Sequence, residues 1–403
     1  MKNSSSITLK KTSLIDATEI TLPASKSISN RALIIDALSG KKSQLMNLSE
    51  ARDTQTMIAL LKEDGDIWNV KDAGTTMRFL TAYSCITEQQ KLITGTERMQ
   101  QRPIKILVEA LRTLGASIEY EKEEGYPPLS IKGFHQIQKN IAIRGDVSSQ
   151  YISALLMIAP QLPQGLELTL EGKIGSKPYI DMTLSLMKKF GIKSDWNQNH
   201  ISISPQSYNP ITYEIEPDWS AASYWYSFVA ISQTGSILLK GLREESLQGD
   251  QAIVEIMREL GVDTTFKSNG ALLTKTESAN EFTFDFTHCP DLAQTVAVVC
   301  AIKGVNASFT GLESLKIKET DRVQALQNEL AKINAQLGES ENGWTLTPSN
   351  NIPSEVIFET YEDHRMAMAF APLCLLMDVT FDDETVVNKS YPGFWLDVNR
   401  ATP

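Results

Sequence analysis

The chain has 403 residues, and its 38 Lys and Arg against 49 Asp and Glu give a formal charge of −11. General binding of nucleic acid needs a basic surface that displaces counterions from phosphates, so this balance argues against that class. Apolar residues make up 42% and charged residues 22%, as in globular chains that build a full core. At roughly 150 residues per domain, the length predicts two or three domains.

The longest apolar runs, residues 154–159 and 296–302, fall well short of the ~18 residues that a membrane span needs. The N-terminus, MKNSSSITLKK, has neither the apolar core of a secretory signal nor the Arg-rich character of a transit peptide. Four widely spaced cysteines with mostly apolar neighbours indicate reduced core residues rather than disulfides or zinc ligands. They are Cys85, Cys289, Cys300 and Cys374. We therefore expect a cytoplasmic protein with no membrane partner.

A pattern of strand, helix and strand recurs five times, and a glycine or a polar turn follows most of the elements. In chain order the copies begin at QLMNL, which is the weakest, and at KLITG, LTLEG, ILLKG and ASFTG. Apolar residues three or four apart give each helix one face for a sheet. The helices are expected to end at residues that tolerate a left-handed backbone. These are Gly115, Gly191, Gly261 and Asn334.

The later copies follow one another at intervals of about 70 residues, which suits a small α+β unit and is too long for a solenoid repeat. Helix capping in any α/β protein also produces such glycines, but the near-constant spacing favours true repetition. The segment Pro205–Pro217, rich in Pro, Asn, Ser and Tyr, is predicted to cross between two domains.

In the first half, predicted helices begin with small or polar residues, and free N–H groups there favour anions. LPASKSISNRAL places Lys26, Ser27 and Arg31 at such a start, although a serine cap with a solvated lysine explains this motif better when it is taken alone. In DAGTTMRFL, Gly74 lets a ligand oxygen approach the backbone because glycine has no Cβ. The sequence has no GxxxxGK[ST] phosphate loop.

Three further segments of the first half carry polar residues before a helix. Arg102 precedes Pro103 in a loop, and Pro178 suits a first helical turn. Simple capping by serine is slightly favoured for each hydroxyl residue taken alone. The polar residues are Ser148, Ser149 and Gln150 in DVSSQYISALLM, and Ser176 in GSKPYIDMTL.

In the second half, Asp291 follows Pro290 at a predicted helix start, where a plain N-cap is the simpler interpretation. KIKETDRVQALQNELAKI is expected to place Lys318 and Arg322 four apart on one helical face, with Glu319 between them. A surface ion-pair ladder explains that segment equally well.

EDHRMAMAFAPL places Asp363, His364 and Arg365 at the start of a helix that is otherwise apolar all round. A buried helix seldom begins with three ionisable residues unless they serve a site, so the functional interpretation is favoured. The histidines show no metal-ligand spacing, and we expect no metal site. They are His135, His200, His288 and His364.

Nine ordered segments together resemble the 5-enolpyruvylshikimate-3-phosphate synthase family. They are LPASKSISNRAL, DAGTTMRFLTA, QQRPI, DVSSQYISALLM, SKPYIDMTL, PDLAQTVAV, KIKETDR, EDHRMAMAFA and NKSYPGFW. The resemblance extends from Leu22 to Trp395. It implies transfer of the enolpyruvyl group of phosphoenolpyruvate to the 5-hydroxyl of shikimate 3-phosphate, on the pathway to chorismate, without a cofactor.

The resemblance also implies an α+β fold of two globular domains, each of three repeated small α+β units, the inside-out α/β barrel type of the enolpyruvyl transferases. One domain would span residues 22–217, and a discontinuous second one residues 1–21 and 218–403, with the active site in the cleft between them. A sixth copy of the repeat is then expected in residues 355–395. We expect a monomer.

By position, the resemblance assigns residues to both substrates. Asp291 would accept the hydroxyl proton, and Glu319 or Lys26 would deliver a proton to carbon 3 of phosphoenolpyruvate. Shikimate 3-phosphate would contact Lys26, Ser27, Arg31, Ser148, Ser149, Gln150, Ser176, Asp291 and Lys318. Phosphoenolpyruvate would contact Lys26, Gly74, Arg102, Gln150, Arg322, Arg365 and Lys389.

The chain departs from the family pattern at three places. Asp72 replaces the Asn of the usual NAGT loop, and this added carboxylate would repel phosphoenolpyruvate unless it is turned away or paired. Ser314 stands where Asn is common, and the stretch Leu61–Asp72 is short, which predicts a trimmed hairpin. Gly74 is retained, so we expect the pocket to admit glyphosate.

Two alternatives remain. The related UDP-N-acetylglucosamine enolpyruvyl transferase carries a reactive cysteine on a mobile loop, and no cysteine of this chain lies in such a segment. A catalytically silent phosphate-sugar binding homologue is disfavoured by the intact Asp291, Glu319 and Lys26, whereas Asp72 keeps it open.

Overall fold

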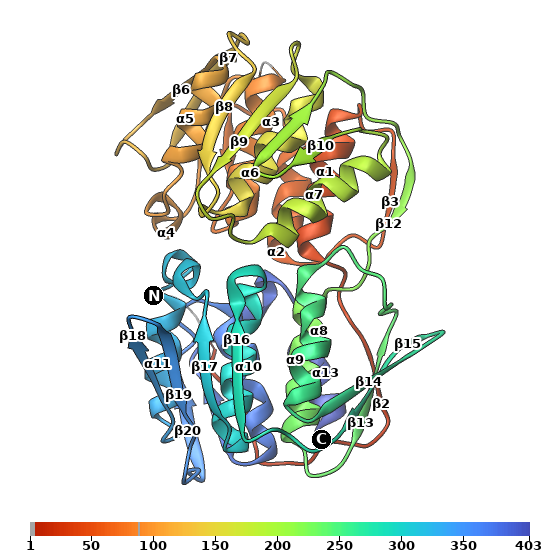
Figure 1. Ribbon diagram of the computed structural model, residues 1–403, viewed down its shortest axis with the longest axis vertical. Helices are drawn as coiled ribbons and strands as arrows, with labels where there is room; N and C mark the ends of the chain where they lie inside the picture. Colours follow the sequence, from red (N-terminus) through yellow and green to blue (C-terminus); the bar gives the residue numbers. More distant parts are fainter. Residues whose placement is uncertain (1–4, 88) are drawn as a thin grey trace. The chain divides into compact units, whose positions relative to one another are not determined.

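The computed structural model describes residues 5–87 and 89–403, so part of the N-terminal segment considered as a targeting signal lies outside the described residues. The chain forms two compact units (Figure 1). The central unit is Ala24–Ile215, and the terminal unit combines the chain up to Pro23 with Glu216–Pro403. The second crossing point, at residues 215–216, falls inside the Pro205–Pro217 segment.

Four sheets of four strands share one topology. In the clearest case, β8 (Asn140–Arg144) runs parallel to β9 (Leu166–Glu171), and a hairpin of β10 (Asp195–Asn197) and β11 (His200–Ile203) adds to β9. The other three sheets have the orders β6-β7-β5-β4, β14-β15-β13-β2 and β18-β19-β17-β16. The recurrence of one strand order confirms true internal repetition.

The strands of these three sheets have the following bounds. They are β4 (Ile67–Asn69), β5 (Lys91–Thr94), β6 (Ala116–Tyr120), β7 (Leu129–Phe134), β2 (Thr18–Thr21), β13 (Ser236–Lys240), β14 (Val262–Lys267), β15 (Gly270–Lys275), β16 (Glu281–Asp285), β17 (Asn306–Thr310), β18 (Gln336–Ser340) and β19 (Gly343–Thr347).

The last two repeats are shorter. In one, β3 (Gln44–Met46) pairs with β12 (Thr212–Glu214) alone among the described strands, so the hairpin that was expected to be trimmed is absent from this sheet. In the other, β20 (Glu355–Phe358) and β21 (Asp378–Phe381) are parallel and β1 (Ile7–Leu9) joins β21, which confirms a sixth copy. The prediction that the QLMNL copy continues into its own second strand was wrong. Only a short loop separates α2 from β4, and β4 opens the next sheet beside β5.

Each unit has three inner helices that pack against one another and against the sheets, and outer helices that follow the second parallel strand of each repeat. The inner helices are α1 (Lys26–Leu38), α3 (Gly74–Ile86) and α6 (Ser149–Ile158) in the central unit, and α8 (Trp219–Ile231), α10 (Ala293–Lys303) and α12 (His364–Phe370) in the terminal unit. The outer helices are α2 (Arg52–Leu60), α4 (Glu97–Gln100), α5 (Lys105–Leu114), α7 (Lys177–Lys189), α9 (Ile253–Glu259), α11 (Arg322–Ala331) and α13 (Phe394–Ala401).

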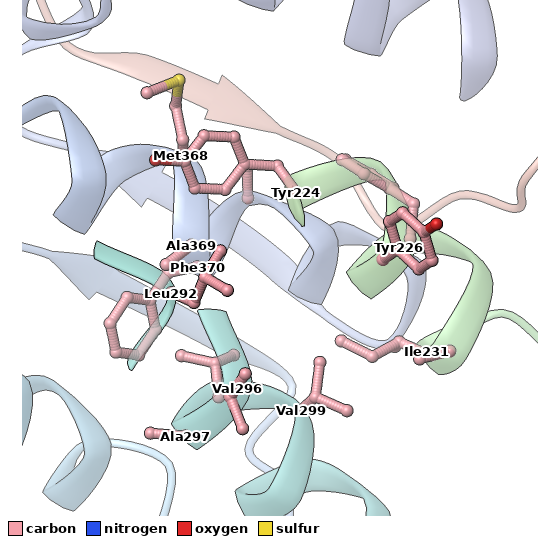
Figure 2. Close-up of a cluster of buried hydrophobic side chains, with 14 of the residues drawn as sticks. Tyr224, Tyr226, Ile231, Leu292, Val296, Ala297, Val299, Met368, Ala369 and Phe370 are labelled. Carbon is pink, nitrogen blue, oxygen red and sulfur yellow. The ribbon is translucent and has the colours of Figure 1, made fainter. Parts of the chain in front are cut away.

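Most inner helices are buried nearly all round because other elements cover them, whereas α1 carries polar and charged residues along its length. Figure 2 shows Tyr224 of α8, Val296 of α10 and Phe370 of α12 in one buried cluster, and each of the three is at most 1% exposed. The outer helices bury one face only, as the spacing of Val323, Leu326 and Leu330 predicts for α11. Helices at the centre and sheets outside them make the inside-out arrangement.

The helix ends occur where the sequence predicts them. Gly115, Gly191, Gly261 and Asn334 have φ values of 119°, 90°, 94° and 60°. At Gly115 a Cβ would lie 1.8 Å from the carbonyl oxygen of His135, so only glycine fits there. All four cysteines are free and buried. Within the described chain, no helix combines the length and apolarity that crossing a membrane requires.

The topology places helix starts together. Each helix between parallel strands begins just after the carboxyl end of the preceding strand, and ligands of α/β folds bind at that edge. The start of an inner helix carries exposed N–H groups and the positive end of the helix dipole. Some predicted site residues, such as Lys26, Gly74 and Ser149, occupy these starts, whereas others, such as Arg102 and Lys318, lie in loops.

Candidate active site

In the central unit, Lys26 is the first residue of α1 and Ser25 is its cap. Lys26 Nζ lies 3.2 Å from Oδ2 of Asp53, which is in the first turn of α2 and only 2% exposed. The Oγ1 hydroxyl of Thr76 in α3 donates to the Asp53 carbonyl oxygen at 3.2 Å. The starts of α1, α2 and α3 therefore meet around one ammonium group.

Arg31 lies one turn further along α1 and is 2% exposed. Its Nε donates to Thr183 Oγ1 at 2.7 Å, and its two Nη atoms donate to the Ser27 carbonyl at 2.9 Å and to Ser153 Oγ at 3.0 Å. Burial lowers the pKa of Arg31 to about 10, so the side chain is charged at neutral pH. These bonds hold its guanidinium where α1, α6 and α7 meet.

Gly74 begins α3, and the guanidinium of Arg102 lies against it. Arg78, one turn along α3, donates to the Gly74 carbonyl at 3.1 Å and to the Pro103 carbonyl at 3.0 Å. Tyr151 of α6 donates its hydroxyl to the same Pro103 oxygen at 2.6 Å. The loop that carries Arg102 is thus fixed from two helices.

Ser148 caps α6 and accepts a hydrogen bond from the Gln150 N–H at 3.4 Å. Ser149 is buried in the first turn, and Gln150 is partly exposed beside it. Ser176 precedes α7 with a left-handed backbone, φ 51°, and Pro178 occupies the first turn as predicted. These serine and glutamine side chains are polar and uncharged, so they suit hydrogen bonds to hydroxyl and phosphate oxygens rather than neutralisation of a charge.

The Asp72 carboxylate, which departs from the family pattern, is paired. Arg52 Nη2 lies 2.7 Å from Asp72 Oδ2, with the two side chains 41% and 29% exposed. Asp72 can therefore lie beside an anion site, because its carboxylate is paired with a cation.

In the terminal unit, Arg322 joins three carboxylates. Its Nε lies 2.6 Å from Asp363 Oδ2, Nη1 3.0 Å from Asp291 Oδ1, and Nη2 2.9 Å from Glu319 Oε2. Arg365 Nη2 lies 2.8 Å from the other oxygen of Asp291. The Arg322 and Arg365 side chains are 3% and 9% exposed, so the pairs are largely removed from water.

Lys389 and Lys318 add positive charge to this cluster. Lys389 is 2% exposed, and its Nζ lies 3.7 Å from Glu319 Oε1. Lys318 is half-buried in the loop before α11, and its charge acts on Asp291. The arrangement therefore brings every predicted residue of the terminal unit into one network.

Two expected local structures were wrong. Lys318 does not share a helical face with Arg322, because α11 begins only at Arg322. Asp321 caps that helix and accepts from the Gln324 N–H at 3.0 Å, as Asp does at N-caps. Asp291 is not an N-cap of α10. It lies in a short 3₁₀ helix, Pro290–Leu292, and its carboxylate binds the arginines instead.

Burial alone would raise the pKa of Asp291, but the nearby charges of Arg365, Lys318 and Arg322 outweigh it and hold that pKa well below its ordinary value. Asp291 is therefore ionised throughout the physiological range. Burial alone would lower the pKa of Arg322, but the facing carboxylates of Asp363, Glu319 and Asp291 outweigh this effect and raise that pKa above its ordinary value.

Some residues of this region were not predicted. Asp250 is 4% exposed and accepts a hydrogen bond from the Ser220 hydroxyl, which also accepts one from Arg365 at 3.4 Å. Burial and the Asp291 charge raise the pKa of Asp250 to about 7. Asp53 and Arg78 were missed in the same way. A charged residue inside a mostly apolar helix is a sequence signal for Arg78, whereas Asp53 and Asp250 lie in polar segments that give no such signal.

The described residues contain no group of three His, Cys, Asp or Glu side chains placed to hold a metal ion. The predicted residues instead form two sets, one on each unit, and each set combines cations with hydroxyl or carboxylate groups. Such sets suit anionic substrates and acid–base chemistry.

Known proteins give a family for this arrangement. The family model described as EPSP synthase (3-phosphoshikimate 1-carboxyvinyltransferase) matches residues 11–67 and 62–398. A protein of Bacteroides fragilis (strain YCH46) named 3-phosphoshikimate 1-carboxyvinyltransferase is 50% identical over 387 residues, which cover 95% of this chain and 94% of that protein. A protein of the same name from Aliivibrio salmonicida (strain LFI1238) is 36% identical over 422 residues, 97% of this chain and 98% of the relative.

A solved structure of EPSP synthase from Acinetobacter baumannii has a TM-score of 0.78 and covers 98% of each chain at 20% identity. That likeness shows the fold, and the family model and the curated relatives show the family. The chain belongs to the EPSP synthase (3-phosphoshikimate 1-carboxyvinyltransferase) family.

Proposed function

We propose that this protein transfers the enolpyruvyl group of phosphoenolpyruvate to the 5-hydroxyl of shikimate 3-phosphate and releases phosphate. Membership of the family supports this activity. The observation that carries it is the buried network in which Arg322 and Arg365 share the carboxylate of Asp291. Such a network places cations where an anionic substrate can bind and keeps one carboxylate ionised beside them.

Phosphoenolpyruvate carries a phosphate and a carboxylate, so its site needs several cations. Arg322 and Arg365 have planar guanidinium groups that suit the carboxylate, and lysines serve as point charges for phosphate. In the proposal the full set is Lys26, Gly74, Arg102, Gln150, Arg322, Arg365 and Lys389. Shikimate 3-phosphate binds through Lys26, Ser27, Arg31, Ser148, Ser149, Gln150, Ser176, Asp291 and Lys318.

The reaction is an addition followed by an elimination. The 5-hydroxyl oxygen bonds to carbon 2 of phosphoenolpyruvate and gives its proton to Asp291, while Glu319 or Lys26 protonates carbon 3. The tetrahedral intermediate then loses a proton from carbon 3 and expels phosphate, which restores the double bond. Proton donors and acceptors suffice for these steps, so no redox cofactor is required.

The ion pairs of Asp291 set the order of events. In the unliganded chain its depressed pKa makes it a weak base. A substrate carboxylate that binds Arg322 and Arg365 competes with Asp291 for their N–H donors, and this weakens the influence that lowers its pKa. We infer that binding of phosphoenolpyruvate activates Asp291 as a proton acceptor.

The proposal includes a monomeric enzyme of the cytoplasm. The four reduced, buried cysteines support a reducing compartment.

The test is phosphate release on mixing the purified protein with shikimate 3-phosphate and phosphoenolpyruvate. We expect release only when both substrates are present, together with a product that has gained the mass of the enolpyruvyl group. UDP-N-acetylglucosamine as the acceptor is expected to give none. Binding of both substrates without release would favour the silent homologue, and turnover with the nucleotide sugar would favour the related transferase.

A further inference from the structure

We propose that Thr183 and Ser153 are positioning residues for shikimate 3-phosphate, because their hydroxyl groups orient the guanidinium of Arg31. The inference rests on the proposed function, since it takes Arg31 as a contact of that substrate. Thr183 lies in α7 and Ser153 in α6, and both are fully buried. Neither hydroxyl can therefore touch a ligand directly, and an effect on binding must pass through a neighbouring side chain.

The two hydroxyl groups form a hydrogen-bond network with a fixed direction. The Thr183 hydroxyl donates its single proton to the Tyr179 carbonyl at 2.8 Å, one turn earlier in α7, and its oxygen accepts from Arg31 Nε at 2.7 Å. Ser153 Oγ lies 2.8 Å from the same oxygen, and because the Thr183 proton is already engaged, Ser153 is the donor of that pair. The Ser153 oxygen accepts from Arg31 Nη2 at 3.0 Å. Both hydroxyl groups thus present an acceptor to the guanidinium.

Four helices surround the guanidinium of Arg31. Besides the bonds to α6 and α7, Nη1 donates to the Ser27 carbonyl of α1 at 2.9 Å, and Nη2 lies 3.5 Å from the Tyr179 carbonyl. The guanidinium lies over the Phe79 ring of α3, with Cζ 5.4 Å from the ring centroid. Since Arg has five N–H donors, these contacts leave one N–H of Nη1 without an acceptor among the described residues.

The charge of Arg31 has no carboxylate partner in the described chain. All its hydrogen-bond acceptors there are uncharged oxygens. Buried charges in proteins are normally paired, because an isolated ion loses its hydration. A guanidinium that is only 2% exposed and is oriented by neutral groups therefore suits a bound anion. Shikimate 3-phosphate offers both a carboxylate and a phosphate.

Loss of the Thr183 oxygen would release one side of this guanidinium. Arg31 Nε would then be a buried donor without an acceptor, which is costly, so the side chain is expected to turn toward another oxygen. Hydrogen bonds to an anion depend on angle, and a turned guanidinium presents its remaining N–H groups in a poorer direction. Binding of shikimate 3-phosphate is therefore expected to weaken although the positive charge remains.

The experiment compares Thr183→Val, which keeps the branched shape and removes the hydroxyl, with Thr183→Ser, which keeps the hydroxyl. We expect Thr183→Val to raise KM for shikimate 3-phosphate about three- to thirtyfold, because a charge-assisted hydrogen bond is partly lost. Thr183→Ser should keep that KM within about twofold, although it deletes a buried methyl group and lowers the melting temperature. KM for phosphoenolpyruvate and kcat are expected to stay within about threefold in both variants. Rescue by serine assigns the effect to the hydroxyl rather than to packing.

A double-mutant cycle tests whether the hydroxyl acts through Arg31. Arg31→Gln is expected to raise KM for shikimate 3-phosphate more than Thr183→Val does, since it removes the charge itself. In the Arg31→Gln background, Thr183→Val should have little further effect, and additive effects would overturn the proposal. If Arg31→Gln does not fold, Arg31→Lys gives the same cycle, because lysine has no Nε–H for Thr183. Ser153→Ala should give a smaller rise than Thr183→Val, because Nη2 also reaches the Tyr179 carbonyl.

Thr81→Val in α3 is the matched control. Thr81 is also fully buried, and its hydroxyl donates at 2.7 Å to the carbonyl of Met77, one turn earlier in the helix. The control thus loses the same bond within its helix as Thr183→Val, but Thr81 makes no hydrogen bond to an arginine of the described chain. It is expected to leave KM for shikimate 3-phosphate unchanged. An equal rise would mean that the bond within the helix, rather than the orientation of Arg31, controls binding.

Equilibrium dialysis of labelled shikimate 3-phosphate measures the same differences without turnover. Equal affinities of the wild type and Thr183→Val would overturn the proposal, as would equal losses in Thr183→Val and Thr183→Ser. Absence of binding by the wild type would overturn it too. Failure of the proposed function is a different result, in which the wild type releases no phosphate although the differences in affinity remain.

Discussion

The guanidinium of Arg102 occupies the space in which a side chain at Gly74 would begin. A Cβ built on Gly74 would lie 2.7 Å from Nη1 and 2.9 Å from Nη2 of Arg102, closer than Cβ atoms in proteins come to such groups. Arg78 and Tyr151 fix the Pro103 carbonyl next to Arg102, so the backbone that carries the arginine is held in place. The position of the Arg102 guanidinium thus depends on the absence of a side chain at Gly74, the first residue of α3.

Gly74→Ala is expected to displace Arg102 and weaken binding of phosphoenolpyruvate. A hydrogen bond to a charged group contributes about 1.5–3 kcal/mol, which corresponds to a rise in KM of roughly tenfold to a hundredfold. KM for shikimate 3-phosphate should change little. Steady-state kinetics with each substrate varied in turn measures both values.

The matched control is Gly338→Ala, since a Cβ at Gly338 would lie 3.9 Å from its nearest neighbour, the Thr345 carbonyl oxygen. That variant should keep both KM values. An unchanged KM for phosphoenolpyruvate in Gly74→Ala would show that Arg102 does not bind this substrate.

Asp291→Asn should remove the proposed proton acceptor and leave the fold intact. Asn keeps the shape and one acceptor oxygen for Arg322 or Arg365, but it takes no proton from the 5-hydroxyl. We expect kcat to fall by at least about a hundredfold, as for loss of a general base. Phosphate release measures the rate, and circular dichroism checks the fold. Near-normal turnover would assign the proton transfer to another group.

Local features of the sequence predicted much of this molecule. The glycines that end the helices, the cap at Asp363 and the buried start of α12 are visible because each depends on neighbouring residues. Local sequence patterns did not predict where one repeat ends and the next begins. β4 looked like the end of one copy, but its pairing with β5 decides its place, and this pairing is a contact between distant residues.

The sequence predicted which residues belong to the candidate site. It could not predict which charged groups face one another there. The carboxylates that set the charge balance come from other elements, as with Asp53 beside Lys26 and Asp250 near Arg365. The partner of Asp72 was also out of reach, because Arg52 is 20 residues away on another helix. Such pairings depend on the packing of three helix starts, which periodicity does not reveal.

Asp250 makes stability depend on pH. Its pKa is raised to about 7 in the folded chain, against about 4 for an unfolded Asp. The protonated form therefore favours the fold. This contribution is full below about pH 4 and is lost as the pH rises through about 7, because the buried carboxyl must then carry a charge near Asp291.

The variant Asp250→Asn stays neutral at every pH. We expect the melting temperature of the wild type to fall by at least ~2 °C more than that of Asp250→Asn between pH 5 and pH 8, measured by calorimetry without ligands. A control is Asp397→Asn, at a second carboxyl with a raised pKa that lies outside the proposed site. Parallel curves for the wild type and Asp250→Asn would show that Asp250 is already ionised at pH 5.

Glu329 of α11 holds the turn that presents Asp363 and Arg365. It is fully buried, with Oε2 accepting from the Glu359 N–H at 3.0 Å and Oε1 accepting from the Tyr361 hydroxyl at 2.8 Å. Tyr361 and Glu362 then both adopt a left-handed backbone, with φ values of 54° and 55°. Two successive residues in that region are costly unless the surroundings hold them.

Glu329→Gln should loosen this turn, because the amide replaces one acceptor oxygen with a donor and leaves a buried N–H or hydroxyl without its partner. A loss of about 1–3 kcal/mol in the free energy of unfolding is expected. Tyr361→Phe should also lose stability, since it deletes the bond that the hydroxyl donates to Glu329 and the bond that it accepts from Asn328 at 3.3 Å. Denaturant unfolding measures both variants. KM for phosphoenolpyruvate should rise in Glu329→Gln as the start of α12, and with it Arg365, becomes less ordered.

The control is Glu359→Gln, whose exposed carboxylate lies 3.8 Å from Lys332 and should contribute less than about 1 kcal/mol. If Glu329→Gln lowers stability and leaves KM unchanged, the turn serves folding alone. If stability is also unchanged, the buried carboxylate does not hold the turn, and its two left-handed residues must be maintained by the packing of Tyr361 and Asp363 instead.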